Sequence, residues 1–374
     1  MWGYRKLDRS GPVQGVKFPI SPFRPRMEKD TLSEQSPHPR RHRLVMNYRS
    51  VWLAALVACA QAQTPGMIAY TCAPDGGPPW PVQDVCTVRI NGSVPQALTG
   101  DGHSHDPSWS PDGKRVLFIH DGALSTKAPY RETEENKSHH PIELSVMDAD
   151  GRNRRVLRVI EPVIYSAAWS PDGNRLAISA VAAVTPGQPS QMGLSLLPAN
   201  GKGELRLLMA NGWSPSWSPD GTKIAFAVEK PRGHWTVHTA DANGMKNVRL
   251  TDDRKNSGSP AWSPDGKRIA FDQFVDENGR QQVFVMNADG SNVRQLTTDI
   301  AWSCGHPSWS SSGSQLVIGC RSASSPCGMG FFSTGQPMSY CTRRLFVVPF
   351  GSGAVAAPTK LMEQDGAIPS CAPR

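Results

Sequence analysis

Short apolar runs, separated by residues that favour tight turns, repeat along most of the chain. In one clear copy, the apolar runs 269–271 and 283–286 flank a polar segment, and the turn-forming residues 287–290 follow. Runs of this length, rich in Val, Ile and Phe and bounded by Gly, Asn and Asp, are typical of β-strands joined by hairpins. The pattern therefore predicts an all-β fold.

A five-residue segment, Trp-Ser-Pro-Asp-Gly, marks the repeat. It begins four times unchanged, and once as Trp-Ser-Ser-Ser-Gly, at Trp109, Trp169, Trp217, Trp262 and Trp309. These tryptophans lie 60, 48, 45 and 47 residues apart, a period typical of an array of supersecondary units. Pro, Asp and Gly at these places favour a type I turn between two strands.

Each repeat contains four predicted strands, as a β-propeller blade does. We expect the tryptophan to fill the space between adjacent blades. Residues 67–99 supply three strands and lack a first one, whereas Pro369-Ser370-Cys371 resembles the start of a repeat. The sequence therefore predicts a six-bladed propeller of four-stranded blades over residues 66–374, its first blade closed by the C-terminal strand.

The formal net charge of +8 lies mostly outside the repeats. Residues 1–45 hold ten Lys and Arg against four Asp and Glu, so the rest of the chain is close to neutral. A near-neutral body without a basic stripe gives no electrostatic footprint for nucleic acid. We interpret residues 1–45 as a disordered or spurious N-terminal extension, and Met46 as a plausible start.

Residues 46–62 are typical of a secretory signal peptide: a short basic stretch, an apolar stretch too short to span a bilayer, and small residues. The segment Leu-Val-Ala-Cys ending at Cys59 resembles a bacterial lipoprotein signal, which predicts lipidation of Cys59. Ordinary cleavage after Ala60 or Ala62 is the alternative. Both predict export to the periplasm or cell envelope.

An oxidising compartment favours pairing of the cysteines that follow. Three local pairs are candidates, because each closes a short loop between two predicted strands. They are Cys72 with Cys86, Cys304 with Cys320, and Cys327 with Cys341. Cys371 is left over.

Both turns of the repeat, Trp-Ser-Pro-Asp-Gly and Met-Asn-Ala-Asp-Gly, recur in register, and the pattern resembles the WD40-like, TolB-type propeller repeat of bacterial envelope proteins. The resemblance covers roughly residues 66–374, without the separate N-terminal domain of TolB. Related propellers precede the hydrolase domain of prolyl-oligopeptidase-like peptidases. Here no Gly-x-Ser-x-Gly nucleophile motif is present, so enzymatic activity is uncertain and not favoured.

Binding in propellers centres on the mouth of the channel, where the innermost strands begin. The residues three positions before the tryptophans are polar and differ from copy to copy: Asp106, Ser166, Ser214, Ser259 and His306. We expect a ligand-binding ring from them. A speculative divalent-metal site would combine His103, His105, Asp106 and His306, since imidazole and carboxylate are ordinary ligands. The alternative is a solvated mouth.

These observations predict an exported envelope propeller that binds another envelope protein or a peptide, is monomeric and non-enzymatic, and needs no cofactor. The alternatives are a polysaccharide lyase or hydrolase with a channel-mouth site, and a cell-wall glycan-binding protein, which would need exposed aromatic residues at the mouth. Nucleic acid is not expected as a partner. Membrane contact is expected only through a lipid anchor.

Overall fold

A computed structural model of the chain describes residues 58–59, 66–72, 83–93, 95–121, 142–160, 162–182, 191–230, 234–323, 328–331, 337–340, 344–351 and 358–361. These residues form strands and turns only, within a compact unit that spans Tyr48–Arg374. None of the described elements is an apolar helix long enough to cross a bilayer.

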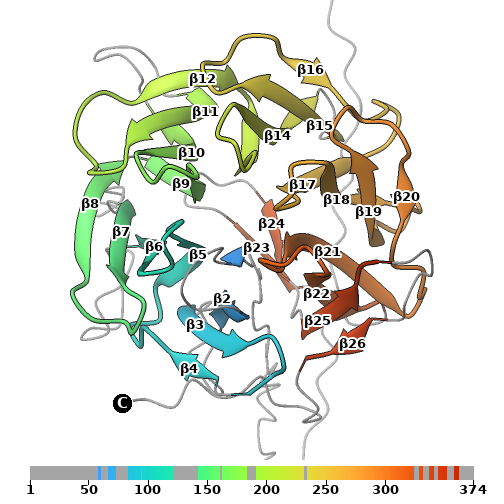
Figure 1. Cartoon of the computed structure of the whole chain (residues 1–374), viewed down its shortest axis with the longest axis horizontal. Helices are drawn as coiled ribbons and strands as arrows, with labels where there is room; N and C mark the ends of the chain where they lie inside the picture. The colour runs from blue at the N-terminus through green and yellow to red at the C-terminus, as the bar shows by residue number, and fades with distance from the viewer. Residues whose placement is uncertain are drawn as a thin grey trace, which may run out of the picture. The chain divides into compact units, whose positions relative to one another are not determined.

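The strands form six antiparallel four-stranded sheets, the blades, which we number one to six in chain order and which surround a central axis (Figure 1). Each blade is listed from its innermost strand outward. Blades one to three contain β1 (Ala58–Cys59), β2 (Met67–Cys72), β3 (Asp84–Arg89), β4 (Gln96–Ala97); β5 (Ser104–Trp109), β6 (Arg115–Asp121), β7 (Ile142–Asp148), β8 (Arg155–Ile160); β9 (Pro162–Trp169), β10 (Arg175–Ala182), β11 (Gln191–Pro198), β12 (Arg206–Ala210).

Blades four to six contain β13 (Gly212–Trp217), β14 (Lys223–Lys230), β15 (His234–Asp241), β16 (Val248–Arg249); β17 (Ser257–Trp262), β18 (Arg268–Phe274), β19 (Gln281–Asn287), β20 (Arg294–Gln295); β21 (Trp302–Trp309), β22 (Gln315–Ser322), β25 (Arg344–Pro349), β26 (Thr359–Lys360). An added hairpin of β23 (Gly328–Phe331) and β24 (Pro337–Tyr340) lies within the insertion of blade six and was not predicted. The all-β, six-bladed propeller is confirmed.

The repeat tryptophans pack between blades, as predicted. Trp169 of blade three is 6% exposed and belongs to one buried cluster with Leu117 and Ile119 of blade two. The guanidinium of Arg115, also from blade two, lies 4.9 Å above the Trp169 ring. Apolar burial and a cation–π contact therefore join successive blades.

Hydrogen bonds within each Ser-Pro-Asp-Gly turn stabilise the hairpin between the first and second strands of the blade. In blade five the hydroxyl of Ser263 donates to the Asp265 carboxylate at 2.6 Å, and the carboxylate accepts the backbone N–H of Lys267 at 3.0 Å. The same contacts recur in the other unchanged copies, at Asp112, Asp172 and Asp220. These aspartates are turn residues, because their hydrogen bonds satisfy the turn itself.

The innermost strand of blade one corrects the predicted closure. The structure fills this place with β1, whose Cys59 pairs with Ile68 of β2 just as Trp109 pairs with Val116 in blade two. In the full-length chain β1, and not the C-terminal segment, takes this place, and the predicted closing strand falls within residues 362–374, which lie outside the described residues. Because main-chain groups along a strand edge pair with any extended segment, the side-chain pattern did not reveal that Ala58–Cys59 could take this place.

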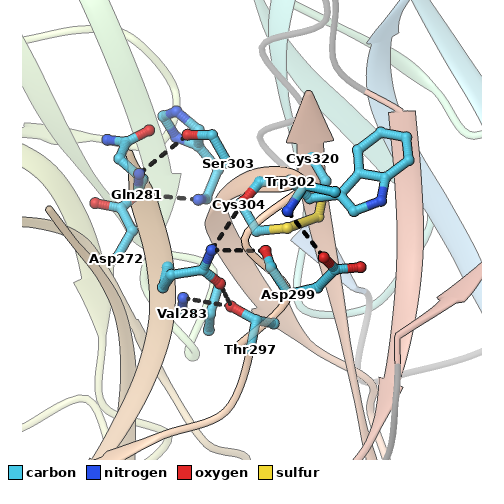
Figure 2. Close-up of a disulfide and its surroundings, with 12 residues drawn as sticks. Asp272, Gln281, Val283, Thr297, Asp299, Trp302, Ser303, Cys304 and Cys320 are labelled. Atoms are coloured by element: carbon cyan, nitrogen blue, oxygen red, sulfur yellow. Dashed lines mark hydrogen bonds between the residues drawn. A yellow bond between two sulfur atoms is a disulfide. The ribbon is translucent and has the colours of Figure 1, made fainter. Parts of the chain in front are cut away.

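Two of the predicted disulfides are present. Cys72 at the end of β2 is bonded to Cys86 of β3, and Cys304 of β21 is bonded to Cys320 of β22 (Figure 2). Cys327, Cys341 and Cys371 lie outside the described residues. The first bond joins two strands within blade one, and the second joins two strands within blade six. Apolar side chains of these two blades form a shared buried cluster at the closure of the ring.

Candidate functional site

A cavity of about 230 Å³ runs along the axis of the propeller, and the innermost strands of blades two to six line it. The predicted ring residues all belong to its wall: Asp106, Ser166, Ser214, Ser259 and His306. We call the side on which the innermost strands begin the entry face. Antiparallel pairing brings the ends of the second strands and the starts of the third strands to the same face.

Most of the ring residues lie on β-bulges with strained backbones. Asp106, Ser214, Ser259 and His306 have φ between 45° and 52°, and each precedes a proline. In blade two, Asp106 and its proline together lie opposite a single residue of β6. Proline cannot donate to a strand ladder, so a bulge on the innermost edge accommodates it. Strained bulges of this kind are concentrated at functional sites.

Side chains of the preceding blade bind the backbone that the bulges expose. The N–H of Asp106 donates to the hydroxyl of Thr71 at 3.1 Å, and the N–H of His306 donates to the carboxylate of Asp272 at 3.0 Å. Thr71 and Asp272 are buried and occupy equivalent places in β2 and β18. The ring is therefore held in place by contacts between blades.

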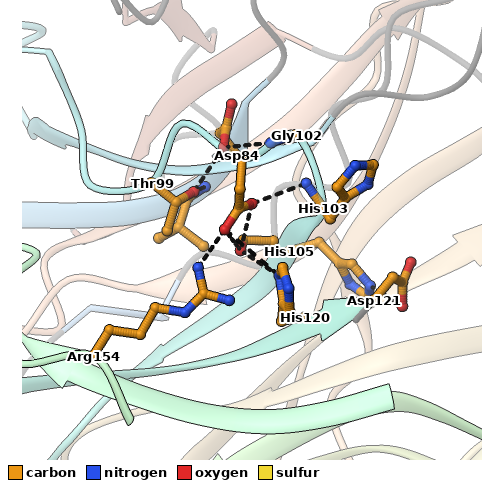
Figure 3. Close-up of polar contacts among 11 residues, drawn as sticks. Asp84, Thr99, Gly102, His103, His105, His120, Asp121 and Arg154 are labelled. Atoms are coloured by element: carbon orange, nitrogen blue, oxygen red, sulfur yellow. Dashed lines mark hydrogen bonds and ion pairs between the residues drawn. The ribbon is translucent and has the colours of Figure 1, made fainter. Parts of the chain in front are cut away.

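Asp106 shares one imidazole with a second carboxylate. His105 Nδ1 lies 3.2 Å from Asp106 Oδ2, and His105 Nε2 lies 3.6 Å from Asp121 Oδ1 (Figure 3). Burial alone would lower the pKa of His105, but the hydrogen bonds to the two carboxylates outweigh it and raise this pKa to about 10. One protonated imidazole between two carboxylates leaves a net negative charge at the rim.

A second polar network on the entry face contains Ser, His and Asp but not the geometry of a nucleophilic triad. The hydroxyl of Ser104 donates to Asp101 at 2.9 Å and lies 3.3 Å from Nδ1 of His120. The Asp101 carboxylate approaches that same nitrogen at 3.6 Å, and Arg154 binds the carboxylate as well (Figure 3). A triad uses opposite ring nitrogens and an accessible hydroxyl. Ser104 is fully buried, so the network is structural.

Two of the candidate metal ligands, His105 and Asp106, contact each other. His105 contacts Asp106 and Asp121, whereas Nδ1 of His306 lies 3.2 Å from the Ser259 hydroxyl, and the His103 ring faces that of His120 at 6.4 Å. Among the described residues, no three His, Cys, Asp or Glu side chains gather as an ion would require.

The sequence interpretation missed an aromatic cluster on the same rim. Tyr165 and Trp213 have ring centroids 4.3 Å apart, and Trp213 and Trp235 have centroids 4.8 Å apart. Tyr165 and Trp213 come directly before ring residues, at the position that His105 has in blade two. Comparing the repeats one residue ahead of the ring would have drawn attention to this position.

The chain matches a known family over more than half of its length. Residues 119–334 match the family described as TolB beta propeller domain. A curated relative, the uncharacterized peptidase YuxL of Bacillus subtilis, is 30% identical over 91 residues, which is 24% of this chain. The match spans only 11% of that relative, so the peptidase's activity does not transfer with it.

Several solved structures share the fold. A putative TolB from Agrobacterium tumefaciens superimposes with a TM-score of 0.55 and 21% identity, over 74% of this chain and 86% of that one. TolB from Acinetobacter baumannii gives a TM-score of 0.53 and 16% identity, over 80% of this chain and 67% of that one. Together with the match over residues 119–334, the repeats and the architecture place this chain in the TolB beta propeller domain family.

Proposed function

We propose that this protein is an exported propeller that binds a basic segment of another protein, or a basic peptide, at the entry face of its channel. The observation that carries the proposal is the sharing of His105 by Asp106 and Asp121, which leaves a negative charge beside the cavity. Among the described lining residues, none is Lys or Arg. The two carboxylates share one positive imidazole, and the negative charge that is left over favours a guanidinium or ammonium group from the ligand.

The residues of the cavity wall favour an extended peptide segment as the ligand rather than a small molecule. Ser214 and Ser259, both half-buried, line the cavity and carry hydroxyl groups that can form hydrogen bonds to a main chain. An extended segment brings both donors and acceptors to such groups.

Export belongs to the same proposal. The buried disulfides Cys72–Cys86 and Cys304–Cys320 support an oxidising compartment, because such bonds are rare where thiols are kept reduced. Anchoring through Cys59 remains a prediction. Mass spectrometry of the mature N-terminus tests it: a lipid-modified Cys59 supports the anchor, and a terminus at residue 61 or 63 supports ordinary cleavage.

The binding test uses three blocked pentapeptides, Ac-Gly-Xaa-Gly-Xaa-Gly-NH2, in which Xaa is arginine, glutamate or citrulline. Citrulline has the shape of arginine without its charge. We expect the arginine peptide to bind most tightly, with affinity that falls as salt is added. Asp106→Asn should weaken its binding about tenfold.

Asp112→Asn is the matched control, since Asp112 is a carboxylate of the same blade in the turn that follows the innermost strand. It should leave binding unchanged. Equal affinity for the citrulline and arginine peptides, or equal loss in both variants, would contradict the proposal.

A further inference from the structure

Three aromatic side chains on the entry face form a continuous surface that we call the aromatic shelf. It consists of Tyr165 in β9, Trp213 in β13 and Trp235 in β15, all half-buried. The Trp213 ring is tilted by 45° from Tyr165 and stands at 82° to Trp235. The shelf therefore joins blades three and four.

The shelf adjoins residues of the cavity wall along the chain. Tyr165 and Trp213 directly precede Ser166 and Ser214, which line it. Trp235 is the second residue of the third strand of blade four, and the start of this strand lies on the same face. A ligand held at Asp106 in blade two would thus reach the shelf by continuing around the rim to the next blades.

The electrostatics of the shelf favour a cation. Glu229 of β14 pairs with Trp235 across the two strands. Burial raises the pKa of Tyr165, and the negative charge of Glu229 raises it further. The faces of aromatic rings are themselves negative, and Trp attracts cations most strongly. Indole faces beside a carboxylate form a surface for a desolvated positive group.

The protein itself shows which cation suits such rings. Arg115 lies 4.9 Å above Trp169, Arg175 lies 4.8 Å above Trp217, and Arg154 lies 5.1 Å above Phe118. Throughout the described part of the chain, no Arg or Lys is stacked on Trp213 or Trp235. Guanidinium stacks on indole as a plane, whereas ammonium is a compact and strongly hydrated charge.

We propose that the aromatic shelf is an arginine subsite: it stacks the guanidinium of an arginine in the partner segment, with Glu229 as counter-charge. The inference rests on the proposed function, since the segment is the one held at Asp106. It adds the identity of a residue in the ligand, arginine rather than lysine.

The test compares Trp213→Leu and Glu229→Gln with a matched control, Trp302→Leu. Trp302 is half-buried at the start of β21 in blade six and packs against Phe346 with centroids 5.1 Å apart. For the arginine pentapeptide we expect about threefold weaker binding in Trp213→Leu, about twofold in Glu229→Gln, and no change in Trp302→Leu. The lysine pentapeptide should bind the unsubstituted protein less tightly and be insensitive to Trp213→Leu.

A second measurement follows peptide binding in the protein without substitutions. The indole N–H resonances of Trp213 and Trp235, assigned by their loss in single Leu variants, should shift when the arginine peptide is added to unsubstituted ¹⁵N-labelled protein. The citrulline peptide should not move them. Unchanged indole signals at saturating arginine peptide, or equal shifts with citrulline, would overturn the arginine subsite.

The two proposals fail separately. Arginine-peptide binding that is weakened by Asp106→Asn but not by Trp213→Leu would keep the channel as the binding site and remove the shelf from it. Indole shifts that persist in Asp106→Asn, together with unchanged affinity, would keep the shelf as a binding site and remove Asp106 in the channel from it. Lysine and arginine peptides that bind equally would leave a basic ligand and exclude the selectivity for arginine.

Discussion

The two ends of each innermost strand differ in how much their residues vary from blade to blade. At the end that leads into the Ser-Pro-Asp-Gly turn, blades two to six all carry a tryptophan that is 5% to 9% exposed. At the entry-face end, the residue before the ring is His105, Tyr165, Trp213, Gly258 or Gly305. One end repeats because the packing between blades repeats, whereas the other end is not constrained by this packing and varies.

The entry-face ends are also held differently. Buried apolar contacts fix the tryptophan end, whereas hydrogen bonds such as Asp106 to Thr71 fix the bulge end. Both disulfides lie toward the entry face, in the blades on either side of the ring closure. Substitutions should therefore cost stability at one end and binding at the other.

The largest expected effect comes from Trp169→Ala. The substitution removes a buried ring between blades two and three, and it should lower the free energy of unfolding by about 3–5 kcal/mol. Urea denaturation measures the change. Trp235→Ala is the comparison, since this half-buried indole of the shelf should cost less stability; an equal loss would break the distinction between the two ends.

Removal of one disulfide should follow in size. Cys304→Ala combined with Cys320→Ala opens a link between residues 16 apart, for which chain entropy predicts a loss of about 3 kcal/mol. Chemical denaturation of the oxidised proteins measures it. If binding of the arginine pentapeptide weakens as well, the disulfide also positions the rim, because His306 follows Cys304 by two residues.

The turn aspartates should give smaller and uniform effects. Asp265→Ala removes the acceptor for Ser263 and Lys267 and should cost about 1 kcal/mol, with similar values in the other three unchanged copies. Because the four turns lie in separate blades, a double variant should show the sum of the single losses. Large differences among the denaturation midpoints of the four single variants would contradict an equivalent role for the four turns.

Another effect concerns His105 and depends on pH. Its folded pKa of about 10 lies above its ordinary value of 6.5, so its stabilising charge is fully present below pH 6.5 and is lost as pH rises toward 10. His105→Gln should remove this part of the alkaline decline in stability. Melting temperatures across that pH range measure it, and unchanged profiles would show that the two carboxylates do not hold a charged imidazole.

The sequence predicted what repeats. Period and turn chemistry gave the blades, the inter-blade place of Trp169 and the set of ring positions around the cavity, because each is a local pattern present in several copies. Contacts that occur at only one place in the ring could not be predicted from the repeat. Asp121 meets His105 only because β5 and β6 are paired, and Tyr165 meets Trp213 only because blades three and four adjoin.

The innermost strand of blade one also could not be predicted from the sequence. A two-residue strand such as Ala58–Cys59 has no periodicity, and it lies inside the segment predicted to be a signal peptide. Its pairing with Ala69 and Ile68 depends on main-chain groups that every residue has. Composition therefore identified this segment as a leader, while only the three-dimensional arrangement gave it a place in the sheet.

The left-handed backbone of the ring limits the chemistry that the channel can acquire by mutation. Side chains branched at Cβ, such as Val, Ile and Thr, are strongly disfavoured at φ near 50°, while Asp, Asn, His and Gly tolerate it. Evolution of the four bulged positions is thus steered toward small polar residues, whatever the selective pressure. Relatives of this propeller can exchange carboxylate, amide, imidazole and hydroxyl groups one blade at a time, but they cannot readily line those positions with branched apolar side chains.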